Sequence, residues 1–253
     1  MAKQAGIGDN LYVAGYDLSG DVGTVQTISS SAPHLDVTGI DKSAHERLFG
    51  NADGEISFNS FFNDAAIHEH EALKGLLRTD RIVSYFRGTV QGGWTANMIG
   101  KQINYDWVRA ADGSLIATVQ ALANGYGLEW GQSLTAGKRT DTTATAPATG
   151  TDVATTTGVS TAFGMAAYLQ VFSFTGTSAT MTIQDSADNS SFLGITGLSA
   201  FTAATGITEQ RIETDTLART IRRYLKVNTT GTFSECTFAV TVVRYAAGNR
   251  AQT

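Results

Sequence analysis

The sequence is poor in charged residues, proline and cysteine. Charged residues make up only 16% of the 253 residues, and two prolines are present. A typical soluble domain has a charged share of about 25%. Hydrophobic residues make up 42% of the chain, which excludes a disordered tail. The composition instead indicates a folded protein whose surface is largely neutral and polar, and such a surface loses little hydration when copies pack together.

The single cysteine, Cys236, excludes an intramolecular disulfide. It lies in an apolar alternating run over residues 232–240. This position indicates a small, buried hydrophobic side chain rather than a reactive thiol.

Strong basic character and long apolar runs are also lacking. The formal net charge of −5 argues against sequence-independent DNA binding, which needs lysine and arginine aligned with phosphates. No apolar run comes near the roughly 18 residues of a membrane helix, and the first nine residues show no signal-peptide core. We therefore expect no membrane partner and a protein that is made and stays soluble in a cytoplasm.

Motifs for catalysis or metal binding are missing as well. His68 and His70 are two residues apart, so on a helix they point in opposite directions and cannot share a metal ion. The glycine pairs lack the spacing of a phosphate-binding loop, and no GxSxG motif occurs. Residues 185–191 resemble a calcium loop but lack its distal glutamate. We expect no catalytic residue, no metal, no cofactor and no enzymatic activity.

The remaining pattern is that of a mainly β protein. Alternating apolar residues separated by Gly, Asn, Asp and Ser predict many short strands. Two helices are also predicted: a short one that starts with the capping-box spacing of Ser43 and Glu46, and a longer one. The longer helix begins at Asn63 or Asp64, ends near Arg78, and has an apolar stripe of Ile67, Leu73, Leu76 and Leu77.

A change in composition divides the chain into two units. Residues 133–160 are rich in Thr and Ala and nearly free of large apolar residues, so we interpret them as an extended linker or an exposed arm. Residues 1–132 then form a first domain, a β-sandwich or barrel-like unit with one flanking α-helix. Residues 161–253 form a second, small β-sandwich, because short strands recur there at sandwich-like spacing.

Several segments together resemble the major tail proteins of long-tailed bacteriophages, particularly those that infect actinobacteria. In the first unit these include LYVAGYDLSGDVG from residue 11, DGEISF from residue 53 and YGLEWG from residue 126. In the second unit, residues 183–189 and 223–227 with the final strand to Tyr245 resemble a β-sandwich appended to such proteins. The resemblance covers most of residues 10–132 and much of 162–245.

The resemblance implies a structural virion protein of the tail tube domain type. Proteins of this family assemble, in the host bacterial cytoplasm, into hexameric rings that stack into a tube around the tape-measure protein. DNA later passes through the lumen without sequence-specific binding, so the tube is the conduit for genome ejection. A closed ring needs a heterologous interface between neighbours, and stacking needs a second interface on the ring faces.

Two regions are predicted to contact neighbouring subunits in such a ring. The candidate interface residues are Asp41, Lys42, Glu46 and Arg47 in segment 41–51, and Arg87, Gly92 and Gly93 in the loop 87–93. A third candidate is the segment 133–160, which either reaches an adjacent ring or simply places the second domain outside the tube.

Other functions remain open at this stage. An aromatic platform of Trp94, Trp107, Trp130, Tyr105 and Tyr126 would suit a carbohydrate-binding protein, and the second unit would suit a host cell-surface glycan. A capsid or tail decoration protein is a structural alternative. A cell-wall hydrolase has no positive motif in its favour.

Overall fold

The computed structural model describes residues 6–75, 78–153 and 160–245. The protein is mainly β, as the sequence predicts, with antiparallel strand pairing and one small helix. None of the helical residues in these ranges forms a segment long and apolar enough to cross a membrane. The elements of the first unit are β1 (Asn10–Val13), β2 (Tyr16–Asp17), β3 (Val22–Ser31), β4 (His34–Asp36), β5 (Arg47–Phe49), β6 (Asp53–Phe61), α1 (Glu69–Leu73), β7 (Asp80–Phe86), β8 (Trp94–Gln102), β9 (Asp106–Arg109), β10 (Leu115–Ala123) and β11 (Glu129–Ser133).

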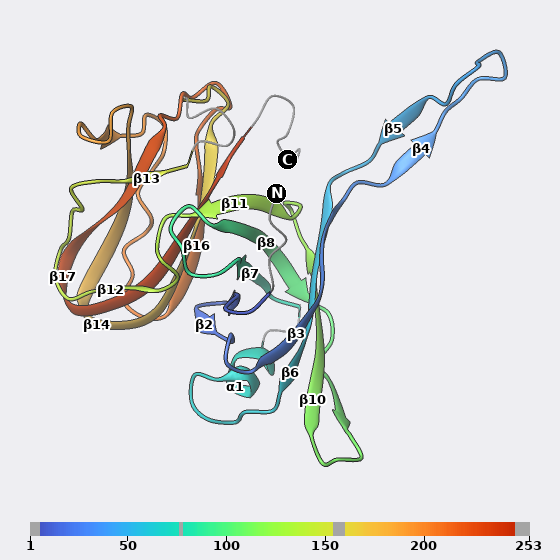
Figure 1. Cartoon of the computed structure of the whole chain (residues 1–253), viewed down its shortest axis with the longest axis horizontal. Helices are drawn as coiled ribbons and strands as arrows, with labels where there is room; N and C mark the ends of the chain where they lie inside the picture. Colours follow the sequence, from blue (N-terminus) through green and yellow to red (C-terminus); the bar gives the residue numbers. More distant parts are fainter. Residues whose placement is uncertain (1–5, 76–77, 154–159, 246–253) are drawn as a thin grey trace.

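The first unit is a sandwich of two layers (Figure 1). Strands β2, β1, β7, β8 and β11 pair in that order in one layer, and β3, β6, β10 and β9 pair in the other, with β8 joined to β10 at one end. The alternating side chains that the sequence pattern predicts meet between the layers. The core residues on the inner faces include Leu11, Val83 and Met98 from the first layer and Ile56, Phe58 and Val119 from the second.

The second unit is built on two very long strands. Its elements are β12 (Arg139–Asp141), β13 (Thr151–Asp152), β14 (Met165–Ser186), β15 (Leu193–Gly194), β16 (Thr208–Glu213) and β17 (Tyr224–Arg244). Strands β14 and β17 pair along nearly their whole length, with register shifts around Gly176. These shifts let the pair curl around its own core, as Figure 1 shows.

A glycine is required at the bend of this strand pair. Gly176 has φ 151°, and a Cβ added there would lie 2.4 Å from the Cα of Phe233. A side chain at position 176 would therefore push the two strands apart at the bend.

Cys236 lies inside this second core, as predicted. It has no exposed surface, and burial raises the pKa of its thiol to about 11. The thiol therefore stays protonated at neutral pH and packs as a small apolar group.

The described part of the segment 133–160 runs along the second unit. Strand β12 pairs with residues 236–238 of β17, and β13 pairs with Tyr224 and Leu225. The guanidinium of Arg139 donates to both carboxylate oxygens of Asp141 and to the carbonyl of Val227. Strands β12 and β13 are thus added to β17, while 154–159 lie outside the described residues. The division into two domains stays a prediction.

The two units share one continuous sheet. Gln132 and Ser133 of β11 pair with Val242 and Thr241 of β17, so the ladder passes from one unit to the other. The side chain of Gln170, 1% exposed, accepts from the backbone N–H of Gly15 and donates to the carbonyl of Ile82. Two apolar clusters fill the rest of the junction: Ile82, Ala166, Tyr168, Val243 and Tyr245, and Tyr12, Phe86, Phe172 and Ala239.

A buried ion-pair cluster lies at the same junction. Arg211 of β16 contacts Glu129 of β11 at 3.3 Å, with side-chain exposures of 5% and 7%. The phenols of Tyr168 and Tyr245 both donate to the Glu129 carboxylate. Burial raises the pKa of Tyr168, so its phenol stays a proton donor. The cluster therefore joins side chains from both units in a site that water does not reach.

Both helix predictions need correction. The predicted short helix after Ser43 is wrong, because Arg47–Phe49 is strand β5, paired with β4. The capping-box spacing is a local signal, and cross-strand pairing overrides it. The predicted longer helix is reduced to α1, five residues long, and Ile67 lies before it with φ 68° and a 51% exposed side chain. Leu76 and Leu77 of the predicted stripe lie outside the described residues.

The junction cluster predicts a large, specific cost of removing Arg211. Arg211→Ala leaves the Glu129 carboxylate buried without its cation, which typically costs about 3–5 kcal/mol. We expect this loss in the free energy of unfolding measured in urea. Arg219→Ala is the control, since the Arg219–Asp215 pair is exposed and such pairs contribute at most about 1 kcal/mol. Equal losses for the two variants would contradict a buried junction cluster.

Candidate assembly surfaces

A long hairpin projects from the first unit. Strands β3 and β6 pair over residues 22–31 and 53–61, and the chain between them continues outward as the β4–β5 hairpin (Figure 1). We call residues 32–52 the arm. Four of the predicted interface residues, Asp41, Lys42, Glu46 and Arg47, lie on the arm, and all four are exposed.

The arm carries apolar side chains that the described chain does not cover. Leu35 and Leu48 are cross-strand partners and are 64% and 59% exposed. Phe49, opposite His34 on the other face of the hairpin, is 75% exposed, and Ile40 at the tip is fully exposed. An isolated soluble protein rarely exposes such a group on a projecting element, so these side chains indicate a contact with another molecule.

The other three predicted interface residues have a different setting. Arg87 forms an ion pair with Asp9 at 2.6 Å, and Tyr85 donates to the same carboxylate. The N–H of Gly92 donates to the carbonyl of Ser133 at 2.8 Å, and that of Gly93 to Val90. These contacts hold the loop 87–93 against the body of the protein. No hydrogen bond or ion pair between described residues joins this loop to the arm.

The outward side of the β3–β6–β10–β9 layer is almost uncharged. Strand register places the side chains of one face toward the core and those of the other away from it. The central residues of the outer face are Thr24, Thr27, Ser57, Asn59, Thr118 and Gln120. The charged residues on this face include Glu55 and Lys101, which flank Leu122 toward one end, and Asp106, which lies opposite Thr118 on the edge strand β9. We call this surface the neutral face.

A second hairpin extends from the end of the same layer opposite the arm. Strands β9 and β10 are joined by the turn at residues 110–114 and project beyond the body (Figure 1). Val108 and Phe61 flank Ile116 in one cross-strand row and are 61% and 51% exposed. The layer therefore carries uncovered apolar side chains near both ends.

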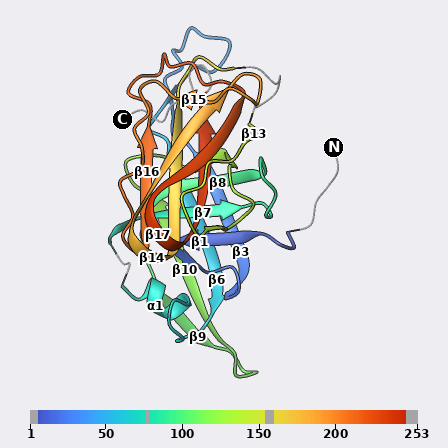
Figure 2. The same ribbon diagram turned by 90° about the vertical axis from the view of Figure 1, so that its left-hand side faces the viewer.

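The predicted aromatic platform is split by the fold. Tyr105 and Trp107 pack edge to face at 5.1 Å and contact His70 of α1; Figure 2 shows α1 and β9 at the same end of the molecule. The ring of Tyr126 is covered by the guanidinium of Arg211 at 3.7 Å. Only Trp94 and Trp130 remain together, on the paired strands β8 and β11, and they are 53% and 49% exposed.

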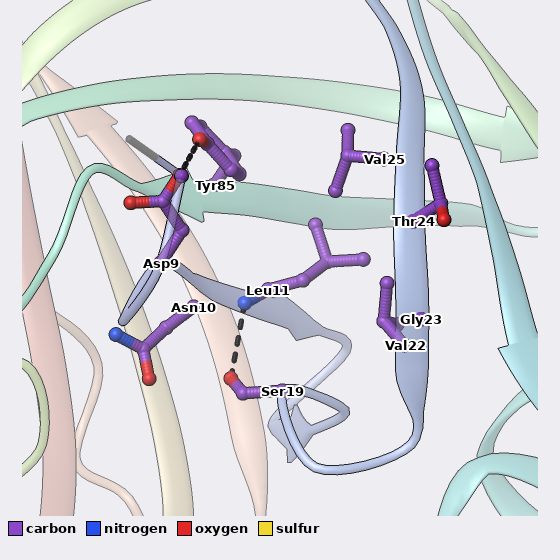
Figure 3. A pocket seen from close by; sticks show the side chains of 10 residues that line it. Asp9, Asn10, Leu11, Ser19, Val22, Gly23, Thr24, Val25 and Tyr85 are labelled. Carbon is purple, nitrogen blue, oxygen red and sulfur yellow. Dashed lines mark hydrogen bonds between the residues drawn. The ribbon is translucent and has the colours of Figure 1, made fainter. Parts of the chain in front are cut away.

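A pocket of about 260 Å³ lies between β1 and β3 (Figure 3). Asp9, Leu11 and Tyr85 line one side, and Val22 and Val25 of β3 line the other. Asp9 is already engaged by Arg87 and Tyr85, and the rest of the lining is mixed, with Leu11, Val22 and Val25 as its apolar side chains and Asn10, Ser19 and Thr24 as neutral polar ones. The sequence gives no signal for this pocket, because Tyr85 is distant in the chain from the other lining residues, which lie between 6 and 25.

A polar cluster fixes α1 on the sheet. Asp21 accepts from the backbone N–H of Glu69 and contacts His68 Nδ1 at 2.9 Å. The Glu69 side chain has no exposed surface, and Ser60 donates to one of its oxygens. The other oxygen finds no hydrogen-bond partner among the described residues. Burial raises the pKa of Glu69, which makes its charged form costly.

The two histidines that a metal site would need have separate partners. His68 bonds to Asp21 and Asn63, and His70 bonds to the phenol of Tyr105. Within the described ranges, no group of three or more His, Cys, Asp or Glu side chains is placed to hold a metal ion. The cluster at α1 is therefore interpreted as a structural anchor.

The sequence matches no protein-family model. No curated protein matches it either. Among solved structures, the chain is similar to a protein in the tail of an empty GTA particle with C6 symmetry, at 17% identity and TM-score 0.39, over 50% of this chain and 97% of that one. It is also similar to the Dit protein of phage SPP1, at 13% identity and TM-score 0.30, over 92% of this chain and 98% of that one. A third similarity is to a protein of the phage p2 baseplate, at 8% identity and TM-score 0.35, over 94% and 98% of the two chains. At these identities and TM-scores, no function follows from the similarity.

Burial of Glu69 predicts a pH-dependent stability difference. Its folded pKa is raised, so the neutral form is the favoured one, and the stability it contributes is present at low pH and lost as the pH rises through the folded value. Glu69→Gln, which stays neutral, should therefore melt at a higher temperature than the wild type above about pH 6. Near pH 4 the two melting temperatures should converge. A Tm difference that is independent of pH between 4 and 8 would contradict this account.

Proposed function

We propose that this chain is a structural subunit of the tail tube of a long-tailed bacteriophage, which self-assembles into stacked hexameric rings. The observation that carries the proposal is a single layer, β3–β6–β10–β9, with a neutral outer face and a projecting hairpin toward each end. The resemblance of the sequence segments to major tail proteins supports the same assignment.

The neutral face is the surface we assign to the lumen of the tube. DNA is held by proteins mainly through Lys and Arg side chains that displace counterions from phosphates. A wall of threonine, serine, asparagine and glutamine offers no such charges, so DNA can pass without being retained. An uncharged wall would also release the tape-measure protein, which must leave the lumen before the genome does.

The arm and the β9–β10 hairpin are the elements that we assign to contacts between subunits. A ring of identical subunits needs a heterologous interface, in which one surface of a copy meets a different surface of the next. The arm carries uncovered apolar residues and four of the predicted interface residues. Strand β3 pairs only with β6 among the described strands, so its other edge is open to a neighbour. Glycan binding by the second unit stays a prediction.

Electron microscopy of the purified protein over a concentration series tests this function directly. We expect rings or tubes of uniform diameter with a central channel, and their fraction should grow with protein concentration because assembly follows mass action. Cross-linking before imaging should give a ladder that ends at six subunits. A monomer at every concentration, also after addition of preformed tail tips as initiators, would contradict the proposal.

Shortening the arm tests its role in assembly. Leu35 and Leu48 are cross-strand partners, so an Asn-Gly turn in place of residues 36–47 can close the hairpin between them. We expect the shortened protein to fold with an unchanged melting temperature, because the removed residues are exposed or half-buried and none of them belongs to a hydrophobic core cluster. It should form no tubes at concentrations where the full chain does. Tubes with the same yield would exclude residues 36–47 of the arm from assembly.

A further inference from the structure

The core-facing side of the β1–β7–β8–β11 layer carries both the residues that line the pocket and the two exposed tryptophans. Strand register places Leu11 opposite Tyr85, Tyr85 opposite Ala96, and Ala96 opposite Trp130, so these four side chains form a row on one face. Trp94 lies on the same face, two residues from Ala96. Ala96 is small and fully buried. The shape of this face is therefore determined by the larger side chains on either side of it, Tyr85 and Trp130.

The open edge of β3 borders this face. Residues 23–25 of β3 line the pocket opposite Leu11 and Tyr85 (Figure 3). Over its ten residues, Val22–Ser31 contains no charged side chain and no proline, the two devices that normally protect an edge strand. We call the pocket, the exposed tryptophans and the β3 edge together the β3 groove.

The chemistry of the groove suits a polypeptide strand. Unpaired N–H and C=O groups along a strand edge are satisfied by another extended backbone, and the pocket and tryptophans then take up its side chains. The occupant must be neutral and partly apolar, because the groove offers no unpaired charge: Asp9 and Arg87 neutralise each other at its end. The pocket volume of about 260 Å³ exceeds by far the ~10–15 Å³ that one water needs, so it has room for a large side chain.

The same chain carries a segment with these properties. The arm is extended, and Leu35, Leu48 and Phe49 are exposed on it. At a rise of about 3.3 Å per residue, the nine residues from Ser31 to Ile40 span roughly 30 Å, enough to reach across a neighbouring domain. Within the part of the chain that the structure describes, each copy thus has one open groove and one uncovered arm.

We propose that the β3 groove of one copy receives the arm of a second copy. The inference rests on the tail tube function proposed above, and it specifies which two surfaces form the heterologous contact. In this arrangement Leu35, Leu48 or Phe49 enters the pocket beside Leu11 and Tyr85. The tryptophans on the same face lose their exposure to water when the arm lies across them.

Tryptophan fluorescence tests the groove separately from assembly. Among the three tryptophans, Trp107 packs at α1, so Trp107→Phe leaves only Trp94 and Trp130 as reporters. On assembly we expect a blue shift of the emission and at least a threefold loss of acrylamide quenching, because both side chains are about half exposed in the free chain. Assembled rings with unchanged emission and quenching would overturn the groove proposal and leave the tail tube function standing. Absence of any assembly would overturn both.

A matched pair of leucine variants tests the arm as the occupant, with all three tryptophans in place. Leu48→Ser on the arm and Leu193→Ser on the second unit remove side chains that are 59% and 57% exposed. We expect Leu48→Ser to raise the concentration needed for assembly at least tenfold in sedimentation, while Leu193→Ser leaves it unchanged. Shifts of equal size, or a blue shift that Leu48→Ser does not affect, would overturn the arm as the occupant.

Discussion

The structure depends on one continuous antiparallel ladder that passes from β11 into β17. A sheet edge left unpaired inside a protein is costly, so each strand at the junction must find a partner from the other unit. The connection is made by two residue pairs, Gln132 with Val242 and Ser133 with Thr241. The buried Glu129–Arg211 pair and Gln170 add specific contacts beside it. Because these groups are withdrawn from water, the two units are fixed relative to each other rather than tethered.

The scarcity of charge in the composition has its structural counterpart in the neutral face and the β3 groove. Charged residues commonly protect strand edges and keep monomers apart; strand β3 has none, and the central strands β6 and β10 of the neutral face carry only Asp53 and Glu55. An isolated protein gains nothing from such surfaces, whereas a subunit that must pack against copies of itself avoids a large desolvation cost. The same neutrality is compatible with a lumen that does not hold nucleic acid.

The candidate assembly surfaces could be predicted only in part from the sequence. Segment 41–51 was predicted as a contact between neighbours, and it lies on the exposed arm. The helix predicted within it was wrong, since a capping-box spacing says nothing about the partner strand that the chain meets ten residues earlier. The prediction of an aromatic platform was wrong for a related reason. The five aromatic residues lie near one another in the sequence, but strand register places them at three different positions in the fold.

The sequence by itself determined the mainly β class, the absence of disulfides, the burial of Cys236 and the low charge of the surface, because these follow from composition and from alternation along single strands. Only the tertiary structure decided that residues 139–141 and 151–152 pair with β17, that Glu69 of α1 is buried, and that Trp94 and Trp130 share a face with Leu11 and Tyr85 of the pocket. Each of these depends on partners many residues apart. Local patterns carry no information on such pairings, whereas register and packing fix them.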